Sequence, residues 1–224
     1  MKSLKSYIQE KLIIKKSTNY KYFPKTKEEL KDIIKQRIKD EGNEVDLNDI
    51  YVSKITDMNG LFCGTDFNGD ISNWDVSNVT DMSFMFNECK EFNQDISNWD
   101  VSNVTNMGGM FHGCKKFNQD ISNWNVSNVK NMSYMFNECK EFNQDISKWN
   151  VSKVTDMSGM FGGCKEFNKD ISSWNVSNVI DMSWIFYGCN KFNRDISNWD
   201  ISNVINMYGM FNNCPIEKKH KPKF

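Results

Sequence analysis

Cysteine, histidine and aspartate are the residues of this chain whose chemistry could make a reactive or metal-binding site. Of the seven cysteines, six recur every 25 residues, each three positions after a phenylalanine: Cys89, Cys114, Cys139, Cys164, Cys189 and Cys214. A free cysteine in such an apolar setting is commonly a small buried residue. A zinc site would need more histidines than His112 and His220, or a C-x-x-C pair. We therefore predict no metal, while disulfides between neighbouring repeats stay open as an alternative.

Aspartate recurs at the same interval, at Asp70, Asp95, Asp120, Asp145, Asp170 and Asp195. Carboxylates at one position of neighbouring repeats would repel one another, so we expect each to accept backbone N–H groups at a bend or to pair with a neighbouring side chain. Calcium binding is the functional alternative, but the glycine-rich nonapeptide of calcium-binding coils is missing. We expect neither a metal nor a cofactor.

Catalysis needs unlike groups, such as a nucleophile and a base, at one place. In this chain the serines of "DISNW" and "VSNV" recur in nearly every repeat, and His112 has no obvious catalytic companion. Polar residues that recur in this way form ladders rather than one site. We predict that the protein is not an enzyme.

The elements that position these residues follow from the 25-residue interval itself. Six full repeats run from Phe67 to about Ile216, and a partial repeat, "ITDMNGLF", precedes them at 55–62. A unit of this length cannot bury its apolar face alone, so neighbouring repeats must stack. In "DISNWDVSNVTDM" apolar and polar residues alternate as in a strand, and "MSxMFxxCK" has the apolar spacing of a helix. We predict a leucine-rich-repeat-like solenoid with short parallel β-strands plus a short α or 3₁₀ helix in each coil.

Three segments are expected. Residues 1–54 form an N-terminal α-helical cap and a degenerate first coil, 55–216 form the solenoid, and 217–224 are a basic, frayed tail. The cap helix should span about 27–40, because Thr26 and Glu29 make a capping box and Leu30, Ile33, Ile34 and Ile38 form an apolar stripe. Membrane-surface or nucleic-acid contact is the alternative for this locally basic segment, but its lysines are interleaved with glutamates, as on a solvated helix face.

When the repeats are aligned, each position of the repeat forms a column of equivalent residues. In one column glycine and an aromatic residue alternate strictly: Gly60, Phe84, Gly109, Tyr134, Gly159, Trp184 and Gly209. In a structural interpretation each ring lies over the gap left by the glycine of the adjacent coil. In a functional interpretation Phe84, Tyr134 and Trp184 form a binding stripe with rings about 10 Å apart, widened by Tyr187 and Tyr208. We favour the structural or a mixed interpretation, because large exposed apolar patches are uncommon unless they are used.

A second variable column is polar and becomes basic toward the C-terminus: Gln94, Gln119, Gln144, Lys169 and Arg194. Because stacking explains the columns that do not change, binding specificity is expected where solvent-facing residues differ. This column is a candidate edge for an acidic partner.

Charge and hydropathy exclude some classes. The formal net charge is -1, so there is no global basic field for nucleic acid, and we expect no nucleic-acid partner. No apolar run is long enough to span a membrane, so we expect no membrane insertion. Charges interrupt "MKSLKSYIQEKLIIKK", and the first cysteine is Cys63, so we see neither a signal peptide nor a lipobox. As written, the chain is expected in the cytoplasm, with export by another route left open.

The phrases "DISNWDVSNVTDM" and "MFNECKEFNQDISNW" closely resemble the repeats of BspA-like leucine-rich repeat proteins, including the related repeat of mycoplasma lipoproteins. The resemblance covers residues 55–214. It implies a solenoid of the leucine-rich-repeat type, often on bacterial surfaces and associated with adhesion or protein binding, with no catalytic residues to transfer.

From these observations we expect a non-catalytic scaffold that presents one face to a protein, with a glycan as a second candidate partner. The alternative is a structural subunit of a larger assembly, such as a virion or surface layer, that self-associates through its ends. The last repeat has no obvious helical cap after Cys214, so the C-terminal coil is a candidate contact between copies.

Overall fold

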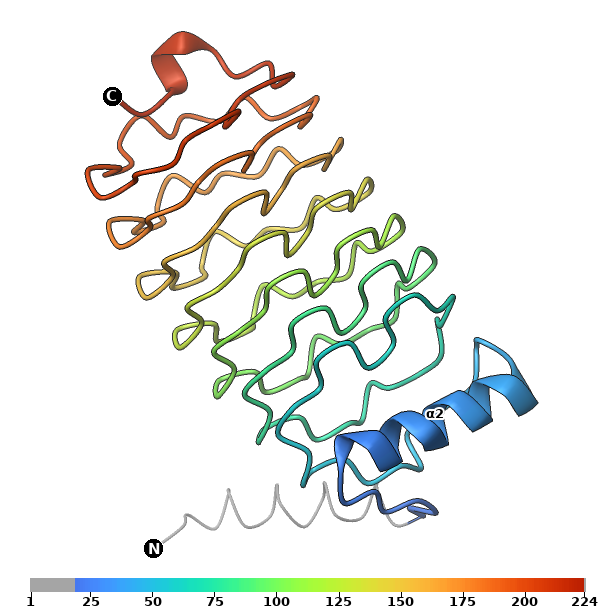
Figure 1. Ribbon diagram of the computed structural model, residues 1–224. Helices are drawn as coiled ribbons and strands as arrows, with labels where there is room; N and C mark the ends of the chain where they lie inside the picture. Colours follow the sequence, from blue (N-terminus) through green and yellow to red (C-terminus); the bar gives the residue numbers. More distant parts are fainter. Residues whose placement is uncertain (1–18, 224) are drawn as a thin grey trace, which may run out of the picture.

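The computed structural model describes residues 19–223. From residue 43 onward the chain winds into successive coils that lie one above another from the N-terminal to the C-terminal end of the molecule (Figure 1). Single parallel bridges join equivalent residues of neighbouring coils: Asp57, Asp81, Asn106, Asn131, Asp156, Asp181 and Asn206. The chain therefore repeats in space with the same interval as in sequence.

Each coil is a chain of tight turns. The carbonyl of Ile71 accepts the N–H of Trp74 at 3.1 Å, and that of Val76 accepts the N–H of Val79 at 2.9 Å. An aspartate or asparagine before each turn caps it, as Asp70 does by accepting the N–H of Ser72 at 2.8 Å and Asn125 by accepting that of Ser127 at 3.2 Å. Turns of this kind use the short acceptor side chains that the repeat supplies at the required positions.

The predicted fold class is wrong. Among residues 19–223 there is no β-strand, and no coil contains the expected short helix; the two helices lie outside the repeats, at α2 (Lys27–Glu41) and η1 (Lys218–His220). The strand-like pattern comes from apolar residues at intervals of three and two, because each turn from Ile71 or Val76 closes over three residues. The helix-like spacing of "MSxMFxxC" is interrupted by residues with positive φ, such as Phe84 at 54° and Glu88 at 59°, which a right-handed helix cannot contain.

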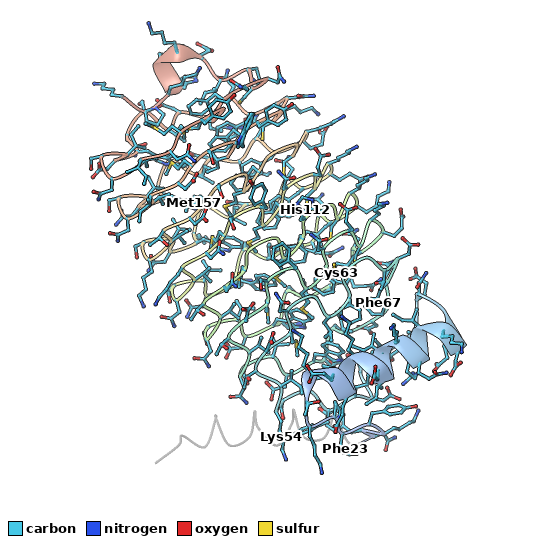
Figure 2. The ribbon with its side chains drawn as sticks, in the orientation of Figure 1. Phe23, Lys54, Cys63, Phe67, His112 and Met157 are labelled. Atoms are coloured by element: carbon cyan, nitrogen blue, oxygen red, sulfur yellow. The ribbon has the colours of Figure 1, made fainter. Side chains whose placement is uncertain are left out.

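The core consists of ladders of identical side chains. Phe86 and Phe111 stack with ring centroids 5.6 Å apart, and Trp99 and Trp124 do so at 6.5 Å. The indole N–H of Trp99 donates to the carbonyl of Ile71 at 3.2 Å, so the buried ring leaves no polar atom unsatisfied. Figure 2 labels Phe67 and Met157, two side chains of this core.

The cysteine ladder is buried and reduced, as the pattern predicted for it. Five of the six repeated thiols are buried, Cys214 is half-buried, and all are free. The thiol of Cys114 donates to the carbonyl of Phe86 at 2.9 Å, and its neighbours do the same one coil along. Burial raises the pKa of Cys89 to about 12, so this thiol stays protonated and unreactive at neutral pH.

Helix α2 covers the first coil (Figure 1). The Thr26 hydroxyl caps it by accepting the N–H of Glu29 at 3.2 Å, as predicted, whereas the Glu29 carboxylate accepts the N–H of Lys25 instead of that of Thr26. Leu30 and Ile34 are buried in the common core. The part of the predicted cap before residue 19 lies outside the described residues.

Residues 217–223 of the C-terminal tail lie against the last coil, whereas we expected a frayed tail. The N–H of Glu217 donates to Oδ1 of Asn193 at 2.9 Å, and the N–H of Ile196 donates to the carbonyl of His220 at 3.0 Å. Ile216 is buried. The tail therefore continues the stack over one side of the last coil. On the other side, no residue within 19–223 accepts from the N–H groups of Met207, Gly209, Phe211 and Asn213.

Neither helix within residues 19–223 has the length and apolar character needed to cross a bilayer.

Candidate functional site: the aromatic face

The aromatic face is defined by the column in which aromatic residues and glycines alternate. Every member of this column has a left-handed backbone. Its φ is 54° at Phe84, 54° at Tyr134 and 58° at Trp184, and 59–65° at the glycines: Gly60, Gly109, Gly159 and Gly209. Glycine adopts this conformation freely, whereas an L-residue with a side chain is destabilised by about 1–2 kcal/mol. Three coils thus carry a bulky residue at a position where glycine would have a lower backbone conformational energy.

Each ring lies over the glycine of the next coil. A Cβ atom added to Gly109 would lie 2.5 Å from Cδ1 of Phe84, and one added to Gly159 would lie 2.6 Å from Cδ1 of Tyr134. At Gly209 the added atom would lie 2.5 Å from Cε3 of Trp184. The alternating large and small packing that the sequence predicted is therefore confirmed.

The same rings are also open to solvent. Phe84 is 47% exposed and Tyr134 is 40% exposed. Trp184 is half-buried because Tyr187 and Tyr208 pack edge-on against it, with ring centroids at 5.2 and 4.9 Å. The structure brings all five predicted aromatic residues to one face, as separate rings at Phe84 and Tyr134 and as a cluster at Trp184. Whether they bind a partner stays a prediction.

Two carboxylates border the aromatic face, and our sequence analysis missed them. A second left-handed column lies four residues later: Gly64, Glu88, Gly113, Glu138, Gly163, Gly188 and Asn213. The carboxylate of Glu88 lies over Gly113, where an added Cβ atom would be 2.7 Å from Oε1, and Glu138 covers Gly163 in the same way. His112 Nε2 lies 3.6 Å from Oε1 of Glu88. Glycine alternates with glutamate in this column only as far as Gly163, and this alternation was the sequence signal for the two carboxylates.

The predicted polar edge is bonded to the stack itself. The side-chain amide of Gln94 donates to the carbonyl of Asn68 at 2.7 Å, and Gln119 and Gln144 make the same bond one and two coils further on. Arg194 Nε donates to the carbonyl of Asn168 at 2.8 Å. Lys169 is half-buried in the same column. The three glutamines and Arg194 connect coils, and a binding role for this column stays a prediction.

The aspartate ladder works as an array of turn caps. The Ser122 N–H, together with its hydroxyl, lowers the pKa of Asp120, and Ser172 lowers that of Asp170 in the same way. In the part of the chain that the structure describes, no three His, Cys, Asp or Glu side chains lie close enough to hold a metal ion.

A shallow groove of about 850 Å³ lies on another face, and the sequence did not point to it. It is lined by Lys130, Lys153, Thr155, Asn178, Ile180, Asn203 and Ile205. Threonine occupies the column of Ile180 and Ile205 in several earlier coils, as at Thr80 and Thr105. The two isoleucines, 45% and 83% exposed, therefore make only the C-terminal end of this column apolar.

Comparison with known families gives one match. A model described as "Mycoplasma protein of unknown function, DUF285" matches residues 29–147 and, again, residues 119–223. No curated protein and no solved structure matches the chain. The two overlapping matches confirm a mycoplasma-type repeat and span most of the sequence. The chain therefore belongs to the mycoplasma protein family DUF285.

Proposed function

We propose that the protein is a non-catalytic binding scaffold whose aromatic face holds a protein partner. The observation that supports this most is that Phe84, Tyr134 and Trp184 keep a left-handed backbone at positions that glycine fills in the coils between them. The rings of Phe84 and Tyr134 are exposed, and that of Trp184 is half-buried. Packing alone does not require a ring there, because the glycine coils form the same core. Backbone strain that persists in this way is typical of functional sites.

The composition of the face suits a protein surface. Tyrosine and tryptophan are enriched at the centres of protein interfaces, where rigid rings contribute much of the binding free energy. The cluster of Trp184, Tyr187 and Tyr208 offers one such anchor, and Tyr134 and Phe84 continue the row toward the N-terminus. The resemblance to BspA-like proteins, which implies protein binding or adhesion, points the same way.

A glycan is the second candidate. Its support is the pairing of exposed rings with the carboxylates of Glu88 and Glu138, since rings stack on sugars and carboxylates accept from their hydroxyls. Rings in every second coil lie about 10 Å apart, as two stacked coils require. A structural subunit that self-associates through its ends is the remaining alternative, and the half-covered last coil is the observation in its favour.

The test is a variant that carries Phe84→Gly, Tyr134→Gly and Trp184→Gly together. Glycine is the natural residue of this column in the other coils, so the variant keeps the backbone conformation. The intact chain and the variant are immobilised and exposed to an extract of source cells and to a glycan array. The matched control is Ile180→Thr with Ile205→Thr, which removes exposed apolar surface from a different face.

A partner that the intact chain and the control retain, and the glycine variant loses, supports the proposal. A glycan retained in this pattern would identify the second candidate. If all three proteins retain the same molecules, the aromatic face is not the binding surface. Light scattering over a concentration series then decides on self-association.

A further inference from the structure

Four columns of backbone N–H groups run the length of the stack on the side of the aromatic face. In each coil four alternate residues, such as Met82, Phe84, Phe86 and Glu88, donate to carbonyls of the next coil. The equivalent bonds of every complete pair of coils measure 2.7–3.1 Å. All these N–H groups point toward the C-terminal end, so the carbonyls of each coil accept from the N–H groups of the coil before it.

Within residues 19–223 no coil follows the last one on this side. Its four equivalent donors are the N–H groups of Met207, Gly209, Phe211 and Asn213, and no residue within 19–223 accepts from them. The side chains around these N–H groups are also more exposed to solvent than their counterparts in the preceding coil. Met207 and Phe211 are half-buried, whereas their counterparts Met182 and Phe186 are fully buried. We call these four N–H groups and their side chains the C-terminal edge.

Unpaired N–H groups in a row carry partial positive charge toward solvent, and the tail adds full charges beside them. Lys221 Nζ lies 5.0 Å above the ring of Phe211. Three further lysines, Lys218, Lys219 and Lys223, accompany a single acidic residue, Glu217, in the segment after Ile216. The C-terminal edge is therefore a surface of hydrogen-bond donors with a positive border.

We propose that the C-terminal edge binds an extended acidic segment of a partner protein. Backbone carbonyls of that segment accept from the four N–H groups, as the carbonyls of the next coil do elsewhere in the stack. The carboxylates of the partner segment pair with Lys221 and the neighbouring lysines. The methylene groups of its side chains cover Met207 and Phe211. Positive charge and a row of donors together select an acidic chain over a neutral or basic one.

A second copy of this chain fits the edge less well. Two C-terminal edges that faced each other would place N–H rows against N–H rows. The opposite end of the stack lies under helix α2, whose Leu30 and Ile34 are buried in the core (Figure 1). A partner with a free extended segment meets neither obstacle.

This proposal is independent of the aromatic face. The variant with three glycines in place of Phe84, Tyr134 and Trp184 retains all four donors of the last coil and the tail, so it should bind an acidic segment as the intact chain does.

The experiment is amide NMR on the full chain with an acetylated, amidated hexaglutamate peptide as the probe. Without peptide, the amides of Met207, Gly209, Phe211 and Asn213 are expected to exchange with solvent far faster than those of Met182, Trp184, Phe186 and Gly188. Added hexaglutamate should shift the first four amides and slow their exchange. Hexaglutamine is the matched uncharged peptide and should bind at least about tenfold more weakly, a difference of about 1.4 kcal/mol.

Lys221→Gln and Lys221→Glu are the matched variants, and their amide spectra report directly whether the stack stays folded. Both should weaken hexaglutamate binding, the second more than the first. Three results would overturn the proposal: shifts confined to other residues, equal binding of the two peptides, or unchanged binding by the Lys221 variants. Protection of the four amides that rises with protein concentration in the absence of peptide would identify a second copy as the occupant instead.

Discussion

The coils of this protein are of two kinds, and they differ on one face only. Coils with an aromatic residue, such as that of Tyr134, and coils with glycine, such as that of Gly159, bury the same Phe, Trp, Met and Cys ladders. They also make the same backbone bonds to their neighbours. Both kinds share a left-handed backbone at the variable position. The comparison teaches that the core and backbone leave this position free to vary, so that the ring belongs to the surface and the glycine exists to make room for it.

The largest effect on the free energy of unfolding is expected from a substitution that adds a side chain in the space under a ring. Gly109→Ala should lower the free energy of unfolding by about 2–4 kcal/mol, because the left-handed φ disfavours alanine and the new methyl group collides with the Phe84 ring. Gly60 has the same φ and no atom closer than 3.9 Å to an added Cβ, so Gly60→Ala should cost only about 1–2 kcal/mol. Urea unfolding measures both.

The pairing of ring and glycine can be tested in the same experiment. Phe84→Gly should restore much of the stability lost in Gly109→Ala, since it removes the collision but not the backbone strain. An equal loss in the Gly109→Ala and Gly60→Ala proteins would contradict the proposed contact.

A smaller effect on the free energy of unfolding is expected when Phe84, Tyr134 and Trp184 are all replaced by glycine. Each substitution should change the free energy of unfolding by less than about 1 kcal/mol, because relief of the left-handed strain offsets the lost contact of a half-exposed ring. Circular dichroism during thermal unfolding checks this. Broad unfolding or aggregation of the variant would show that the rings hold neighbouring coils together, and the candidate binding face would then be a packing feature.

Acid should weaken both kinds of coil alike, because the aspartate caps are common to them. Hydrogen bonds from the serine two residues on lower the pKa of Asp120 and Asp170 in the folded chain. The stabilisation is therefore present above the ordinary aspartate pKa of about 3.9 and is lost as pH falls through the folded value. The urea midpoint, measured from pH 6 down to pH 2, should fall over this range.

Asparagine already caps the second turn of the same coil at Asn125, where it accepts the N–H of Ser127 at 3.2 Å. Replacing the aspartates from Asp120 to Asp195 by asparagine should therefore keep the fold and flatten the pH dependence. An unchanged acid transition would assign it to other carboxylates.

The smallest difference is expected in the reactivity of the cysteines. The buried thiols of the two kinds of coil should react with an alkylating reagent equally slowly. With an alkylating reagent at neutral pH, exposed Cys63 should react at once and half-buried Cys214 more slowly, while the five buried thiols stay unmodified until the chain unfolds. Mass spectrometry of digested protein measures this. Fast labelling of Cys139 or Cys164 would indicate that the stack opens locally.

Much of the candidate site was predictable because the interval of 25 residues assigns each residue to a column. The packing of rings over glycines followed from the strict alternation, since a large and a small residue in adjacent coils complement each other in volume. The two glutamates of the second column were missed, although Glu88 and Glu138 alternate with glycine as far as Gly163, because a charged residue does not suggest a packing contact. The polar edge was interpreted from charge alone, and the bonds from Gln94 and Gln119 to the preceding coil could not be seen without coordinates.

By itself the sequence determined the repeat, the membership of each ladder, the burial of its thiols and rings, and helix α2 with its Thr26 cap. These properties depend on residue type and on a fixed interval, which sequence displays directly. Only the tertiary structure decided that the coils are built of turns, that Phe84 and its equivalents are left-handed, and that the tail after Pro215 covers half of the last coil. The turn bonds join residues three apart, such as Ile71 and Trp74, and in the sequence this spacing looks like the alternation of a strand. The bonds between coils join residues about 25 positions apart, and apolar spacing within one repeat carries no information about those.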